Sequence, residues 1–118
     1  MVSVLIKSAK KFGLKEEQIE VWAKKALKKY RLNNCELSLV FVKPEEILNL
    51  NQKYRNLKRA TSVLTFFQGQ AYPEKLLLGD IVLCPLVAKE KNLSIEFLIS
   101  HGIHNLLSEI PTAKSLRT

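Results

Sequence analysis

The chain has little glycine, proline or cysteine. Among its 118 residues there are four glycines, four prolines and two cysteines. So few glycines and prolines exclude a collagen-like or low-complexity chain, and two cysteines are too few for a disulfide framework. Cys35 and Cys84 stand in apolar, strand-like runs. We therefore expect buried free thiols and a reducing, cytoplasmic compartment.

Long apolar runs are also missing. The apolar residues before Lys7 are too few for a signal peptide. Residues 97–108 carry no Asp, Glu, Lys or Arg, but they reach only about half of the ~20 residues that a membrane-spanning helix needs. We therefore expect a soluble protein that does not bind a membrane.

Positive charge is what the chain has in excess. It contains 19 Lys and Arg against 11 Asp and Glu, which gives a net charge of +8. Hydrophobic residues make up 47% and charged residues 25%, a mixture typical of globular proteins. The length fits a single domain over residues 1–118, and the net charge favours an anionic partner.

Hydrophobic spacing predicts four strands and four helices. The strands are expected at residues 2–6, 36–42, 61–67 and 76–84, and the helices at 14–30, 44–54, 85–91 and 94–107. Residues 68–75, with Gly69 and Pro73, are interpreted as a loop. Two adjacent strands among helices indicate an α+β fold, in which helices pack on a four-stranded mixed sheet. Trp22 and Gly102 are expected to face the core.

Both histidines fall on the last predicted helix. At about 100° per residue, His101 and Asn105 share one flank of the apolar face, whereas His104 lies almost opposite that face. Taken alone, His101 is interpreted as a boundary residue bonded to backbone, and His104 as a solvated residue. A zinc site needs three or more converging ligands, which two histidines do not provide.

A basic cluster follows the second predicted helix. Lys53, Arg55, Lys58 and Arg59 have no acidic residue among them. Two interpretations stay open: a solvated connection that favours the helix C-terminus, or a phosphate-binding patch in which Arg supplies a planar fork of donors.

Two further features are less specific. The lysines and arginine at 24, 25, 28, 29 and 31 are interpreted as the solvated outer face of the first helix. Asp80 is the one acid inside an apolar strand. It is either a structural carboxylate at a bulge or an active-site group.

The order of four motifs is more specific. They are N-Q-K-Y-R at 51–55, T-S-V-L-T-F at 61–66, L-G-D-I-V-L-C-P-L-V-A at 78–88 and H-G-I-H-N-L-L at 101–107. In sequence and order they resemble the YbeY family of small bacterial zinc-dependent endoribonucleases, which mature ribosomal RNA. The resemblance covers about residues 36–107 and implies the same four-stranded mixed sheet.

The resemblance also implies roles for particular residues. Arg55 matches the family's arginine that acts on RNA and is the expected catalytic residue, and His101 is the expected metal ligand. Lys53, Lys58 and Arg59 are the expected RNA-binding residues. The implied cofactor is zinc, and the implied partners are ribosomal RNA or ribosome-associated proteins.

The metal motif is only partly present. The family pattern is H-G-x-x-H-x-x-x-x-x-H, and an ungapped alignment puts Asn105 and Pro111 at the second and third histidines. A one-residue deletion would instead make His104 the second ligand. The flank shared by His101 and Asn105 favours the ungapped alignment. We therefore expect zinc to bind weakly or to be absent.

Three hypotheses follow from this mixture. The first is a YbeY-like RNA-processing enzyme, which the family motifs favour. The second is a non-catalytic homologue that binds RNA or the ribosome, which the altered ligand positions favour. The third is a truncated or frameshifted chain, short at the C-terminus relative to the family, whose residues after Leu107 are not the ancestral ones.

Overall fold

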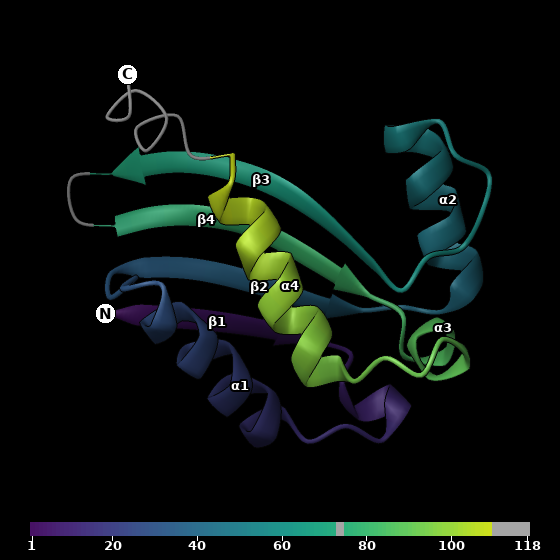
Figure 1. The fold of residues 1–118 in the computed structure, drawn as a ribbon, viewed down its shortest axis with the longest axis horizontal. Helices are drawn as coiled ribbons and strands as arrows, with labels where there is room; N and C mark the ends of the chain where they lie inside the picture. The colour runs from purple at the N-terminus through teal and green to yellow at the C-terminus, as the bar shows by residue number, and fades with distance from the viewer. Residues whose placement is uncertain (73–74, 110–118) are drawn as a thin grey trace.

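The computed structural model describes residues 1–72 and 75–109 and contains one four-stranded sheet (Figure 1). Its strands are β1 (Val2–Lys7), β2 (Cys35–Phe41), β3 (Val63–Tyr72) and β4 (Lys75–Leu83). Their order across the sheet is β1-β2-β4-β3. The β1–β2 and β2–β4 pairs are parallel and the β3–β4 pair is antiparallel, so the predicted mixed sheet is confirmed.

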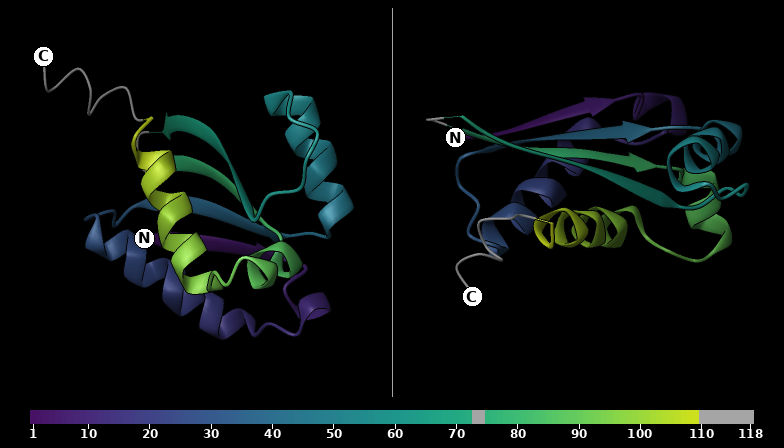
Figure 2. Two further views of the ribbon diagram at one scale, coloured as in Figure 1. Left: turned by 45° about the vertical axis from the view of Figure 1, so that its right-hand side comes forward. Right: turned by 90° about the horizontal axis from the view of Figure 1, so that it is seen from above.

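Four α-helices and a short 3-10 helix accompany the sheet. They are η1 (Lys10–Phe12), α1 (Glu16–Lys29), α2 (Pro44–Arg55), α3 (Pro85–Glu90) and α4 (Ile95–Leu107). Figure 2 shows α1 and α4 side by side on one face of the sheet, with α2 and α3 near one end of it. Within residues 1–72 and 75–109, no helix has the length and apolar character needed to cross a membrane.

The main core lies between the sheet and the pair α1 and α4. Residues of β2 alternate between buried and half-buried, as expected for a strand whose two faces have different surroundings. The buried set on the helical face includes Leu37, Leu39, Phe41, Ile81, Leu98, Ile99, Ile103 and Leu106. Trp22 is only partly buried at the rim of this core, so its predicted inward position is confirmed only in part.

The predicted loop at residues 68–75 is wrong for residues 68–72 and 75, and its residues 73 and 74 lie outside the described residues. The strand β3 continues to Tyr72, and β4 begins at Lys75. A register shift between Phe67 and Gln70 contains Gly69, whose φ of +58° suits a bulge. The pairing with β4 therefore continues past a glycine that, in the sequence, indicates a loop.

Two glycines allow neighbouring segments to pack closely. One lies between adjacent strands of the sheet, and the other lies where α4 packs on the sheet. Gly79 has φ of +146°, and a Cβ there would collide with the Phe66 carbonyl. Gly102 is buried on α4, and a Cβ there would lie 2.9 Å from Ile81 Cδ1. The predicted inward position of Gly102 is thus confirmed, and α4 packs directly on β4.

Replacing Gly102 with leucine should destabilise the fold. The new side chain would overpack the contact with Ile81, and such changes cost about 1–3 kcal/mol. Urea unfolding followed by circular dichroism measures this cost. His101→Leu is the matched control, because it adds the same side chain to an exposed position on the same helix. An unchanged unfolding free energy in Gly102→Leu would contradict the packing of α4 on β4.

Candidate functional site

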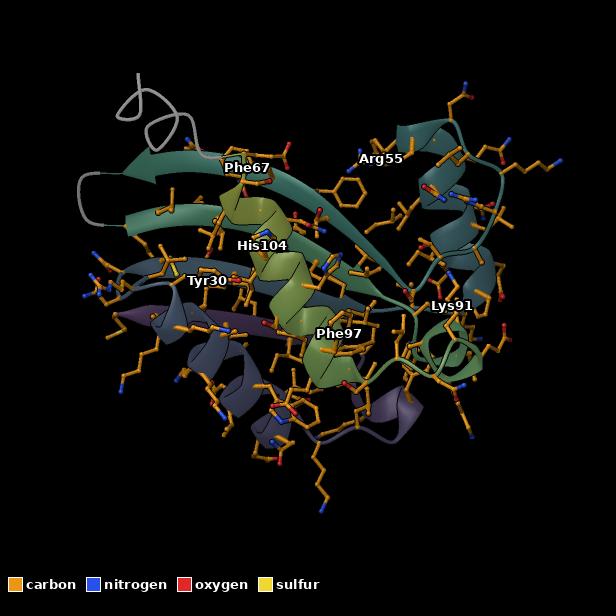
Figure 3. All side chains as sticks on the ribbon, in the orientation of Figure 1. Tyr30, Arg55, Phe67, Lys91, Phe97 and His104 are labelled. Carbon is orange, nitrogen blue, oxygen red and sulfur yellow. The ribbon has the colours of Figure 1, made fainter. Side chains whose placement is uncertain are left out.

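Arg55 lies at the last position of α2 and is anchored to the edge strand β3. Its Nη2 donates a hydrogen bond to the Thr65 carbonyl at 2.7 Å, and its Nη1 donates to the Tyr54 carbonyl at 3.5 Å. The guanidinium carbon lies 5.2 Å from the centroid of the Phe66 ring. Figure 3 shows the side chain projecting from the end of α2 toward β3. These contacts fix the position of an otherwise exposed guanidinium.

Two aromatic rings connect Arg55 to Lys53. Tyr54 and Phe66 meet edge to face, with centroids 5.2 Å apart and ring planes at 74°. Lys53 Nζ lies 5.2 Å from the Tyr54 centroid. The four side chains therefore form a row in the order Lys53, Tyr54, Phe66 and Arg55. We call these four residues the Arg55 cluster. Such a row offers positive charge for phosphates and ring faces for stacking.

The basic residues Lys58 and Arg59 lie on the loop after α2, and a side chain of α2 bonds to this loop. Asn56 has a left-handed φ of +58° and ends α2. The buried side chain of Asn51 donates from Nδ2 to the Arg59 carbonyl at 3.0 Å. Lys58 and Arg59 are exposed beside the Arg55 cluster in the chain. The structure thus places Lys53 and Arg55 in one cluster, with Lys58 and Arg59 on the adjoining loop.

A hollow of about 380 Å³ adjoins the Arg55 cluster. It is lined by Val40, Leu50, Tyr54, Phe66, Asp80 and Val82. Asp80 is only partly buried and pairs with Phe66 across the β3–β4 ladder, so the hollow brings a carboxylate next to the two rings. The sequence analysis missed Tyr54 and Phe66. The aromatic residue between two cations in K-Y-R was the available signal for Tyr54.

The histidines of α4 have different neighbours. His101 is exposed and stacks on Phe97, with centroids 5.8 Å apart and planes at 13°. His104 Nδ1 lies 3.3 Å from the hydroxyl of Tyr30 on α1. Asn105 is partly buried. His104 is exposed, as the helical wheel predicted, but its contact with Tyr30 was not predicted.

The described residues do not fit a three-ligand zinc site. In residues 1–72 and 75–109, no three His, Cys, Asp or Glu residues gather where they could hold a metal ion. His104 bonds across to α1, and the neutral amide of Asn105 is a poor zinc ligand. The third family position, Pro111, lies outside the described residues.

Neither cysteine is suited to act as a thiolate. Both are free and buried, as predicted. Burial raises the pKa of Cys35, against a smaller lowering by the N-terminal ammonium and Lys75. Burial likewise raises the pKa of Cys84, although the backbone N–H groups of Val87 and Leu86 oppose it. Both side chains are therefore neutral thiols near pH 7 in the metal-free protein.

Comparison with known proteins identifies similar chains. The family model described as endoribonuclease YbeY matches residues 5–108. An endoribonuclease YbeY of Aquifex aeolicus is 38% identical over 112 residues, which cover 88% of this chain and 74% of the relative. That of Staphylococcus epidermidis is 36% identical over 107 residues, covering 77% of this chain and 68% of the relative.

A solved structure is similar as well. The solution structure of TM1509 from Thermotoga maritima matches with a TM-score of 0.51 and 27% identity. The match covers 90% of this chain and 71% of that chain. The similarity thus extends over both the sheet and the helices that carry the candidate site.

The ligand positions predict the zinc content of the protein. We expect the purified chain to hold well under one zinc ion per molecule, because imidazoles do not occupy the second and third ligand positions of the ungapped alignment. Asn105→His should raise zinc affinity, and adding Pro111→His should raise it further. Inductively coupled plasma mass spectrometry after dialysis measures the bound zinc.

The control removes the first ligand position. His101→Ala in the double variant should abolish the gain in zinc. Stoichiometric zinc in the unmodified chain, lost on His104→Ala, would contradict this prediction and support the alignment with a one-residue deletion.

Proposed function

The chain belongs to the YbeY family, and from that premise we propose that it binds single-stranded RNA during ribosomal RNA maturation and weakly promotes its cleavage. The observation that carries the proposal is the Arg55 cluster, where a guanidinium is held against an aromatic ring at the sheet edge. The names of the relatives support an endoribonuclease.

Arg55 is proposed to bind a phosphate of the RNA. A guanidinium has five N–H donors in a rigid fork, and the Thr65 and Tyr54 carbonyls accept from Nη2 and Nη1. The remaining N–H groups are available for phosphate oxygens. Because its partners fix the guanidinium before RNA arrives, it can stabilise charge that develops on the phosphoryl group at little reorganisation cost.

The neighbouring residues are proposed to hold the RNA strand. Tyr54 is 52% exposed, so a base can reach it. Stacking of a base on an aromatic side chain contributes about 1–3 kcal/mol and tolerates any base. Lys53, Lys58 and Arg59 would attract flanking phosphates. The expected specificity is therefore for single strands, whose bases are free to stack.

A non-catalytic RNA-binding homologue is the second candidate. The observation in its favour is Asn105, a neutral amide at a ligand position of the family motif. Zinc has no step in the proposal above, since the described residues do not fit its site. Among the described residues, His101 is the one histidine that the ungapped alignment puts at a ligand position. The two candidates share the Arg55 cluster and differ in cleavage alone.

RNA binding should weaken with salt, and less steeply without Arg55. Each phosphate contact on a single strand contributes about 0.7 to the slope of log affinity against log salt. Arg55→Ala should therefore lower the magnitude of the slope by about 0.7 and reduce affinity. Filter binding of a single-stranded oligoribonucleotide across salt concentrations measures both quantities.

The control removes the same charge elsewhere. Lys25 is exposed on α1. In Lys25→Ala, the slope of log affinity against log salt should stay closer to the wild-type value than it does in Arg55→Ala. Equal slopes and affinities for wild type and Arg55→Ala would exclude the Arg55 cluster from RNA binding.

Cleavage should depend on the planar fork of Arg55. We expect weak cleavage of single-stranded ribosomal RNA fragments by the unmodified chain. Arg55→Lys keeps the charge but loses the fork, and removal of a positioned donor of this kind lowers turnover roughly 10²-fold. Gel analysis at saturating RNA measures the rate. RNA binding without any cleavage by the unmodified chain would reject the enzyme and support the non-catalytic homologue.

A further inference from the structure

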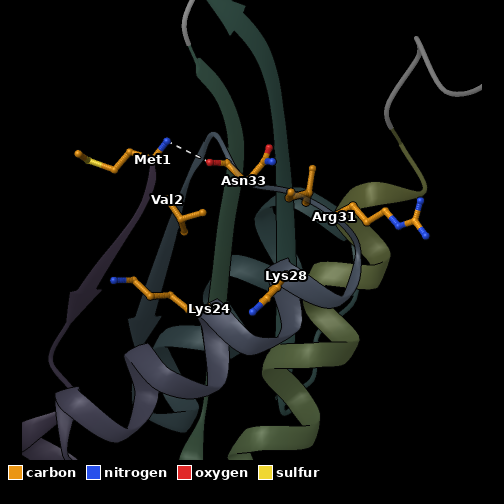
Figure 4. A pocket seen from close by; sticks show the side chains of 7 residues that line it. Met1, Val2, Lys24, Lys28, Arg31 and Asn33 are labelled. Carbon is orange, nitrogen blue, oxygen red and sulfur yellow. Dashed lines mark hydrogen bonds between the residues drawn. The ribbon is translucent and has the colours of Figure 1, made fainter.

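A second hollow, lined in part by basic residues, lies at the other side of the molecule, between the start of β1 and the end of α1 (Figure 4). Its volume is about 710 Å³, within the range of small-molecule sites. Besides Met1, its lining consists of Val2, Lys24, Lys28, Arg31, Leu32 and Asn33. We call it the α1 hollow. Its lining includes basic and apolar side chains but no acidic one.

Two of the basic residues that line the α1 hollow are lysines of α1. Lys24 and Lys28 are one helical turn apart, so both project from the same side of α1. Figure 4 shows them beneath Val2, whereas Arg31 points away from them. Glu20 Oε1 lies 3.7 Å from Lys24 Nζ, but both side chains are about half exposed, at 47% and 50%. Such an exposed pair is weak and leaves Lys24 able to bind another anion.

The end of α1 builds the apolar wall. Arg31 adopts a left-handed φ of +61°, which is uncommon for a residue other than glycine. Its N–H donates to the Lys28 carbonyl and the Leu32 N–H donates to the Leu27 carbonyl, each at 2.9 Å. This pair of bonds is the Schellman ending of a helix, and it turns the chain back. Leu32 follows this turn, and it lines the hollow together with Val2.

The α1 hollow is separate from the Arg55 cluster. The strands β1 and β3 form opposite edges of the sheet, and α1 packs against β1 whereas Arg55 is bonded to β3. A ligand in the α1 hollow therefore does not compete directly with one at the Arg55 cluster. The two sites can be tested independently.

We infer that the α1 hollow binds one nucleotide of single-stranded RNA, with the base against Val2 and Leu32 and the phosphate between Lys24 and Lys28. The inference rests on the proposed function in taking RNA as the partner. A nucleotide combines a planar base, whose faces can lie against apolar side chains, with a charged phosphate that can bind the two ammonium groups. An acidic peptide would use the charge but not the wall.

The test uses uridine 5′-monophosphate and the amide resonances of Leu32 and Asn33. In ¹H–¹⁵N spectra, the nucleotide should shift both resonances more strongly than uridine or inorganic phosphate alone. Lys24→Gln with Lys28→Gln should raise the dissociation constant roughly tenfold or more, because both charge-assisted contacts are lost. Both lysines are exposed, so the fold should persist.

The matched control lies on the same helix. Lys25 and Lys29 have the same spacing and exposure but line a different hollow, which includes Glu96. Lys25→Gln with Lys29→Gln removes the same charge and should leave nucleotide binding at Leu32 and Asn33 within about twofold of wild type. An equal loss in both double variants would show a general charge effect and overturn the inference.

Other results decide between the two proposals. No shift at Leu32 and Asn33, or an equal response to a glutamate-rich peptide of the same charge, would overturn the inference. Arg55→Ala should leave the nucleotide response unchanged. If Arg55→Ala also binds single-stranded RNA as tightly as wild type, the proposed role of the Arg55 cluster fails while the α1 hollow remains a nucleotide site.

Discussion

The packing of α4 on β4 depends on the missing side chain of Gly102. A Cβ at this position would lie 2.9 Å from Ile81 Cδ1, so a larger residue would require the Ile81 side chain or the helix to shift. A similar constraint acts from the sheet, because a Cβ at Gly79 would lie 3.2 Å from Leu106 and would collide with the neighbouring strand. Once the helix is seated, its rotation is determined. His101 then remains exposed, while His104 reaches Tyr30 on α1.

Arg55 has a structural role as well as the proposed chemical one. An edge strand presents unpaired backbone groups that invite pairing with other chains, and charged side chains counter this. Arg55 binds the Thr65 carbonyl on the edge strand β3 and covers the Phe66 ring. The same contacts hold its exposed guanidinium in place. Protection of the edge and preorganisation of the site thus come from one set of contacts.

The family features of the chain are unevenly retained. The sheet, the glycines where α4 meets β4 and the arginine of the Tyr-Arg motif are present, whereas the ungapped alignment puts Asn105 at a ligand position of the metal motif. A scaffold that keeps this arginine without the full ligand set agrees with the proposal that the chain binds RNA and cleaves it only slowly. The net charge of +8 agrees with a large anionic partner.

The local sequence pattern determined most of the secondary structure of this protein. Residue patterns predicted each α-helix and strand close to its observed bounds except in the β3–β4 hairpin, and they predicted the mixed sheet, but they did not predict the 3-10 helix η1. Only the tertiary structure decided the contacts between distant segments. Tyr30 and His104 are 74 residues apart, and Phe66 meets Tyr54 across the gap between a helix and a strand. Such pairs, and the α1 hollow, depend on how elements pack against one another, which the spacing of residues within one element does not specify.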